Sequence, residues 1–124
     1  KRQQAYNAIF LYDKNRLLAL KSDAIEPMIE MLLFDDKYIK LFVADVLAEM
    51  GWAQDATQHA RLAVARQDWK TAEDLGVPAV EVLLEALYSS DAKIWLGAIR
   101  ALAKIGDARA TQPIIEKLSD LYAL

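Results

Sequence analysis

The stretch AVEVLLEALYSSDAKIWLGAIRALAKIGD, residues 79–107, contains the pattern that decides the fold of this chain. Its apolar residues recur at steps of three and four on both sides of a polar break, and this spacing is typical of amphipathic helices. Pro78 precedes the first helix, where a missing backbone N–H is tolerated. Asp91 is placed to cap the second helix, and Gly106 is placed to end it. The stretch therefore predicts a tight αα-hairpin.

The same pattern occurs twice in the chain, at an interval of 55 residues. Pairing residues 1–55 with residues 56–110 without a gap gives 16 identical pairs, and many other pairs exchange one aliphatic side chain for another. A third copy begins where residues 110–118 align with residues 79–87. We therefore expect a single domain with a first repeat unit at 1–55, a second at 56–110 and the start of an incomplete third at 111–124.

Aspartates and glycines mark further helix ends. Asp68 is predicted to cap a short helix over residues 69–75, which Gly76 would end in a left-handed conformation. The adjacent Asp35 and Asp36 could suggest a metal site. One aspartate is needed at that position to cap the following helix, so we interpret the pair as a cap.

The helix predicted over residues 92–105 is apolar on two sides. One side carries Ile94 and Ala98, and the nearly opposite side carries Leu96 and Ile99. A helix of this kind is expected to be buried on both sides, and a stack of repeats provides the two neighbours. No segment alternates in the manner of a β-strand. The sequence therefore predicts an all-α fold, an α-solenoid or superhelix of αα-hairpin repeats.

Residues 79–118 resemble the HEAT-like repeats named after phycobilisome lyases. The resemblance rests on AVxxLxxAL at 79–87, on Asp91, on ALxxIGD at 101–107 and on RAxxPI within 109–115. It implies a solenoid of HEAT-like αα-hairpin repeats. The inner helices of such a solenoid line its concave surface, which is the usual surface for binding a partner.

The chain departs from the family pattern at two places. The inner helix of this family usually has a basic residue after its first aliphatic position, where the first copy has Lys40 and the second has Trp95. The first copy also ends in Met50, Gly51 and Trp52 instead of Ile-Gly-Asp. Both departures leave aromatic groups near the surface.

The composition argues against several classes of protein. Hydrophobic residues make up 55% and charged residues 27%, as in folded domains and unlike disordered chains. The net charge of −3 and the pI of about 5.1 argue against a nucleic-acid partner. The chain contains no apolar run long enough for a membrane span, no signal-peptide pattern and no cysteine, so we expect a cytoplasmic protein without membrane contact.

The residues that could carry catalysis do not form a recognisable constellation. His59 is the only histidine and cysteine is absent, so nucleophilic pairs and Cys/His zinc sites lack their parts. Glu26 and Glu30, like Glu81 and Glu85, lie one turn apart on the outer helices, and we interpret them as a solvated face without partners. We therefore predict no enzyme, no cofactor and no metal site.

One polar stripe on the two inner helices is the candidate binding surface. It contains Tyr38, Phe42, Asp45 and Glu49 in the first copy and Lys93, Gly97, Arg100 and Lys104 in the second. Trp52 and Trp95 add large rings of the kind enriched at interface hot spots. Two compatible interpretations are open: the stripe binds a partner, or its acidic residues in the first copy pair with its basic residues in the second. Gly97, inside a helix, indicates either close packing or partner contact.

These observations predict a non-catalytic protein-protein interaction scaffold or adaptor, with a protein partner of unknown identity. The resemblance implies an alternative, a subunit or chaperone of a bilin lyase, which would handle a tetrapyrrole. The basic residues of the second copy keep a third class, nucleic-acid binding, open against the acidic net charge.

The last predicted helix has an apolar side without a neighbour. Ile114, Ile115 and Leu118 lie on that side, and the chain stops one helix short of a full repeat. The chain also begins without methionine. We therefore expect either a longer parent chain or a homo-oligomer that forms through uncapped repeat ends.

Overall fold

The computed structural model describes residues 1–34 and 36–122. Within these ranges the chain forms nine α-helices and three short 3-10 helices and contains no strand, so the predicted all-α fold is confirmed. The α-helices are α1 (Arg2–Phe10), α2 (Lys14–Leu20), α3 (Ile25–Leu32), α4 (Lys37–Glu49), α5 (Ala56–Ala65), α6 (Trp69–Leu75), α7 (Val80–Ala86), α8 (Ala92–Ile105) and α9 (Thr111–Tyr122). The 3-10 helices, Lys21–Ala24, Val77–Ala79 and Ala108–Ala110, lead into α3, α7 and α9.

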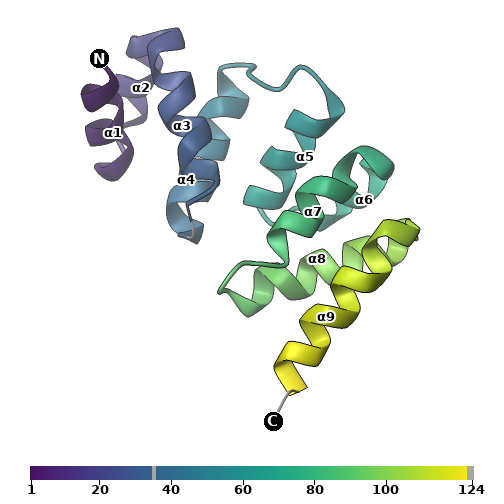
Figure 1. Ribbon diagram of the computed structural model, residues 1–124. Helices are drawn as coiled ribbons and strands as arrows, with labels where there is room; N and C mark the ends of the chain where they lie inside the picture. The colour runs from purple at the N-terminus through teal and green to yellow at the C-terminus, as the bar shows by residue number, and fades with distance from the viewer. Residues whose placement is uncertain (35, 123–124) are drawn as a thin grey trace.

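The helices follow one another along the molecule, and Figure 1 shows the two termini at opposite ends. Helix α3 packs against α4, and α7 packs against α8, which gives the predicted αα-hairpins. Two helices precede each hairpin, α1 and α2 in the first case and α5 and α6 in the second. Helices α2 and α6 begin at residues 14 and 69, and α4 and α8 at residues 37 and 92, so the helices recur at the interval seen in the sequence.

Unusual backbone conformations recur at the same interval. Positive φ angles occur at Tyr12 and Gln67, at Lys21 and Gly76, and at Gly51 and Gly106. Gly106 has the left-handed helical conformation predicted for the end of α8. Gly76 combines φ 70° with ψ −134°, so the left-handed ending predicted for α6 is wrong. The chain leaves α6 in an extended direction there because it enters a 3-10 helix at the next residue.

Aspartates cap the helices as the sequence predicts. Asp68 accepts a hydrogen bond from the backbone N–H of Thr71 at 3.3 Å, and Asp91 accepts one from that of Lys93 at 2.9 Å. Asp36 caps α4. Asp35, the other member of the acidic pair, lies outside the described residues. Each cap satisfies a backbone donor that the first turn of a helix leaves without a partner.

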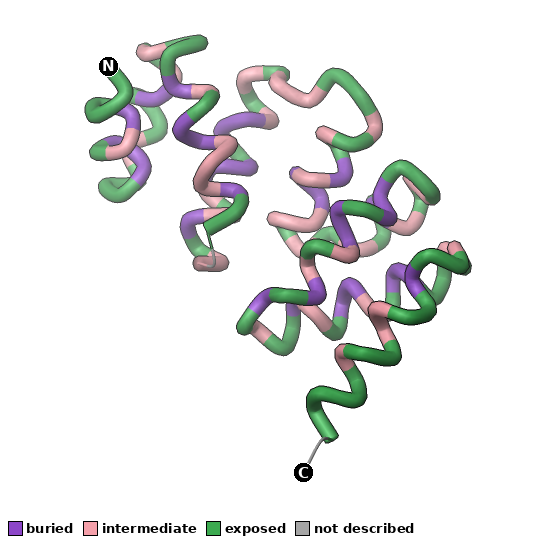
Figure 2. Tube along the Cα trace, in the orientation of Figure 1, coloured by how far each residue is buried: buried purple, intermediate pink, exposed green. Residues whose placement is uncertain are grey.

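Two clusters of buried apolar residues form the core, and α5 connects them. The larger members are Ile9, Leu17, Met28 and Leu47 in the first cluster and Val80, Leu83 and Leu102 in the second. Leu62 of α5 belongs to the first cluster, whereas Ala60 and Ala63 of the same helix belong to the second. Figure 2 shows the buried positions on the sides of the helices that face their neighbours. This packing fixes α5 between the two hairpins.

Helix α8 is buried fully on one side and partly on the other. Ile94 and Ala98 are buried, as predicted. Leu96 is 38% exposed, and Ala103 is also exposed. The expected burial on both sides is therefore met only in part: Ile99 is half-buried and packs against the second core, whereas Leu96 and Ala103 face the groove beside α6.

Helix α9 has no buried residue. Ile114 packs against the second core, but Ile115 and Leu118 are 50% and 38% exposed. The apolar side of α9 therefore lacks a neighbour within the part of the chain that the structure describes, as the repeat alignment indicates. Among the described residues, no helix combines the length and the apolar character that a membrane crossing needs.

Candidate binding groove beside α8

A groove of about 560 Å³ lies between α6 and α8. It is lined by Gln67, Trp69, Glu73, Lys93, Leu96, Gly97, Arg100, Ala103 and Lys104. The groove thus brings the second-copy half of the predicted polar stripe together with the short helix α6. The Asp68 cap fixes the start of α6 and so positions the side chains that face α8.

The base of the groove is formed by Trp69 against Gly97. Gly97 is buried, and a Cβ atom at this position would overlap the Trp69 ring. Close packing therefore accounts for a glycine inside α8, which confirms one of its two interpretations. Sequence reasoning alone does not single out Trp69 or Glu73. The one available signal is Gly97, because a glycine within a helix often marks the close approach of another group.

The groove has an excess of positive charge. The side chains of Lys93 and Arg100 form no ion pair or hydrogen bond with any described residue. Lys104 Nζ lies 3.7 Å from a carboxylate oxygen of Glu73, which is the only acidic residue in the lining. The groove lining therefore contains three basic side chains and one carboxylate, on a protein whose net charge is −3.

The pairing expected across the repeat boundary does not occur. Asp45 bonds to Arg66 Nε at 2.8 Å, and Glu49 lies 3.2 Å from Lys14 Nζ. The prediction that these acidic residues pair with Arg100 and Lys104 is therefore wrong. Helix packing places the end of α5 and the start of α2 next to α4, so nearer cations satisfy both carboxylates, and neither carboxylate compensates the basic residues of the groove.

The first-copy half of the stripe has a different surface. Phe42 is half-buried, and its ring packs edge-on against Tyr12 with ring centres 5.2 Å apart. Tyr38 is exposed, with Lys37 Nζ 5.4 Å from the centre of its ring. In the repeat alignment, Phe42 of α4 is equivalent to Gly97 of α8, and Lys14 of α2 is equivalent to Trp69 of α6. The aromatic ring of this pair of positions therefore lies on the inner helix in the first copy and on the short preceding helix in the second.

Trp52 and Trp95 lie away from the groove. Trp52 is half-buried and packs against the first core cluster. Trp95 is half-buried and has Lys117 Nζ of α9 at 5.0 Å from its ring centre. The structure therefore groups four of the ten candidate residues, Lys93, Gly97, Arg100 and Lys104, in one groove and distributes the others over neighbouring surfaces.

Glu26, Glu81 and Glu85 are exposed, so the expected solvated face is confirmed for them. Glu30 on the outer helix α3 is half-buried and has partners on α1. It accepts a hydrogen bond from the Tyr6 hydroxyl and another from the Arg2 guanidinium. The hydrogen bond from Tyr6, followed by the interactions with Arg2, lowers the pKa of Glu30 below its ordinary value. The hydrogen bond to Glu30 also raises the pKa of Tyr6, because the carboxylate holds the hydroxyl proton.

The exposed glutamates on the outer helix of the second copy also form ion pairs. Glu85 bonds to Arg61 at 2.9 Å, and Glu81 bonds to Arg109 at 3.1 Å. Arg61 is equivalent to Tyr6, so both copies use the same position to reach the outer helix. These partners lie at least 24 positions away along the chain, which is why spacing within one helix does not reveal them. In the described part of the chain, no cluster of three His, Cys, Asp or Glu side chains is suited to hold a metal ion.

Helical hairpins that recur along an all-α chain define the class of protein, a helical repeat fold. Residues 96–120 match the family described as PBS lyase HEAT-like repeat. The matched segment runs from α8 into α9 and includes Arg100 and Lys104, so the resemblance to these repeats is confirmed for this part of the chain. Searches of curated proteins and of solved structures find no match.

Proposed function

We propose that this protein is a non-catalytic scaffold that acts in the cytoplasm and binds an acidic segment of a partner protein in the groove beside α8. The observation that carries the proposal is the groove lining, which contains Lys93, Arg100 and Lys104 but only one carboxylate, Glu73, close to Lys104. Side chains of opposite charge would compensate this excess and would also accelerate the encounter with the partner.

The groove also has the apolar surface that a protein partner needs. Trp69, Leu96 and Ala103 lie among the basic residues. Buried aromatic and arginine side chains carry much of the binding energy in protein interfaces. The volume of about 560 Å³ accommodates a few side chains and lies within the usual range for ligand sites. We therefore expect an acidic segment that contains at least one apolar anchor.

The test compares a charge-reversed groove with a matched control. Lys93→Glu combined with Arg100→Glu reverses two exposed groove residues, and Lys1→Glu combined with Lys21→Glu makes the same change in net charge outside it. Calorimetric titration uses a peptide of glutamates and leucines and a second peptide with glutamine in place of glutamate. We expect the groove variant to bind the acidic peptide at least about tenfold more weakly, whereas the control variant binds normally.

The other two function classes are included as competing ligands. Biliverdin, followed by its visible absorbance, stands for a bilin, and a single-stranded oligonucleotide stands for nucleic acid. Equal loss of peptide binding in the groove and control variants would contradict the proposal. Tighter binding of biliverdin or of the oligonucleotide than of the acidic peptide would also contradict it.

A further inference from the structure

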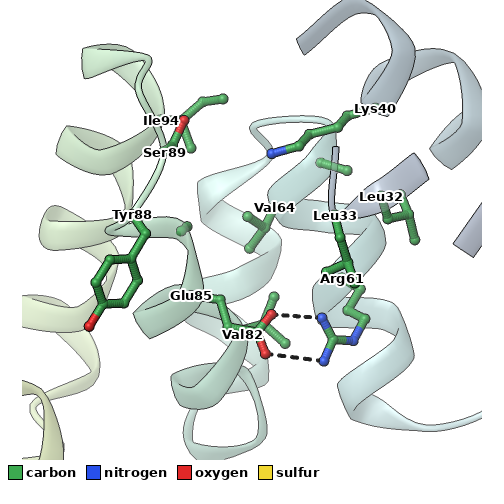
Figure 3. A pocket seen from close by; sticks show the side chains of 12 residues that line it. Leu32, Leu33, Lys40, Arg61, Val64, Val82, Glu85, Tyr88, Ser89 and Ile94 are labelled. Atoms are coloured by element: carbon green, nitrogen blue, oxygen red, sulfur yellow. Dashed lines mark hydrogen bonds and ion pairs between the residues drawn. The ribbon is translucent and has the colours of Figure 1, made fainter. Parts of the chain in front are cut away.

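A second cavity, of about 200 Å³, lies between the two copies. Figure 3 shows side chains from the end of α3 and from α4 facing side chains of α5 and α7 around it. None of the residues that line this cavity also lines the groove beside α8. A ligand at this position would therefore occupy a separate site.

Most of the cavity wall is apolar. The apolar residues are Leu32, Leu33, Val64, Ala65, Val82, Ala86 and Ile94. Leu32, Val82 and Ile94 are buried, so packing of the two cores holds this part of the wall in place. An apolar ligand body in this cavity would be removed from water on several sides, which favours binding in proportion to the area covered.

The charged residues of the wall leave one cation without compensation. Arg61 donates two hydrogen bonds to Glu85, at 2.9 and 3.4 Å, and Figure 3 shows these two bonds as dashed lines. Lys40 is half-buried, and its side chain forms no ion pair or hydrogen bond with the described residues. Figure 3 shows this side chain extending across the top of the cavity. The cavity thus combines apolar walls with a single available ammonium group.

We infer that this cavity is a binding site for a small carboxylic acid with an apolar body. The carboxylate pairs with Lys40 Nζ, and the body packs against Val64 and Val82. A cavity of about 150 Å³ is large enough for benzene, so a volume of about 200 Å³ accommodates a body of five or six carbons. The position equivalent to Lys40 in the second copy is Trp95, so the second copy lacks the lysine of this site.

Hexanoate and its uncharged counterpart hexanamide test the inference. Ligand-observed NMR titrations give the affinity of each compound for the wild-type chain and for Lys40→Gln, which removes the charge and keeps a similar length. We expect hexanoate to bind the wild-type chain in a saturable way and to bind Lys40→Gln about tenfold more weakly, because a charge-assisted hydrogen bond is lost. Hexanamide should bind both chains equally.

Three further variants complete the design. Ala86→Leu fills the cavity and should weaken both compounds, whereas Lys21→Gln removes an exposed charge elsewhere and should weaken neither. The Lys93→Glu/Arg100→Glu variant should bind hexanoate normally, so failure of the proposed groove function and failure of this inference are distinguishable. Absence of saturable hexanoate binding, or equal affinity of the wild-type chain and Lys40→Gln, would overturn the inference. A loss in Lys21→Gln as large as in Lys40→Gln would overturn it as well.

Discussion

Lys21 and Gly76 occupy equivalent positions and have almost the same backbone conformation. Lys21 has φ 53° and ψ −130°, and Gly76 has φ 70° and ψ −134°. Glycine reaches this region without a steric penalty, whereas the Cβ atom of lysine is strained there. The second copy therefore contains the residue that the shared turn favours, and the first copy does not.

We predict that Lys21→Gly increases the free energy of unfolding by about 1 kcal/mol, because the relief of strain exceeds the entropy that glycine adds to the unfolded chain. Urea denaturation followed by circular dichroism measures the change. Gly76→Ala makes the opposite change, from glycine to a residue with a Cβ atom, at the equivalent position. The added Cβ atom meets nothing within 4 Å, so any loss of stability comes from backbone conformation alone. A lower urea midpoint for Lys21→Gly would show that the turn is not strained.

At the scale of helices, side chains of α1 hold α3 in place. Arg2 and Tyr6 both bond to Glu30, and all three lie at or near the surface. The pKa of Glu30 in the folded chain is lowered from 4.5, first by the hydrogen bond from Tyr6 and then by Arg2. The carboxylate therefore stabilises the fold fully above its unfolded pKa, and this stabilisation is lost as the pH falls through the lower, folded pKa.

We predict that Glu30→Gln reduces the loss of stability that the wild-type chain shows when the pH falls below about 4.5. The amide cannot ionise, so its contribution does not change with pH in this range. Denaturation midpoints at neutral and acidic pH measure the difference. Glu26→Gln, one turn earlier on α3, is the control and should keep the wild-type dependence on pH. An unchanged pH dependence in Glu30→Gln would refute the role of this contact.

At the scale of the whole molecule, the two ends of the helical stack differ. The exposed residues of α1 are mostly polar, among them Gln3 and Asn7, and Phe10 at its end is 52% exposed. The outward side of α9 carries Ile115, Leu118 and Leu121, which are between 38% and 50% exposed. Exposed apolar ends of repeat stacks usually need a cover. We propose that two chains associate through α9.

Light scattering after size exclusion, over a range of concentrations, tests this association. We predict a mass that rises with concentration from 13.9 kDa toward twice that value for the wild-type chain. Leu118→Gln combined with Ile115→Gln removes apolar surface from an exposed face, so this variant should fold and remain a monomer. A wild-type chain that stays monomeric at all concentrations would show that α9 is stable without a cover.

The sequence predicts the all-α fold, the interval of 55 residues and the aspartate caps, because each depends on residues that are close along the chain. A cap needs only an aspartate and the backbone N–H two or three residues later. Helical spacing of apolar residues identifies which side of a helix is buried when a neighbour is present, as for Ile94 and Ala98. It does not show that the side with Leu96 remains open.

The sequence by itself determined the helices, their repetition and the basic residues of the polar stripe on α8. Only the tertiary structure decided which charges pair: Asp45 with Arg66, Glu85 with Arg61, and neither carboxylate with a basic residue of α8. Ion pairs between helices depend on interhelical distances that the packing of the cores sets. For the same reason, only the folded chain shows Trp69 against Gly97 and the cavity beside Lys40, since residues far apart in sequence form both.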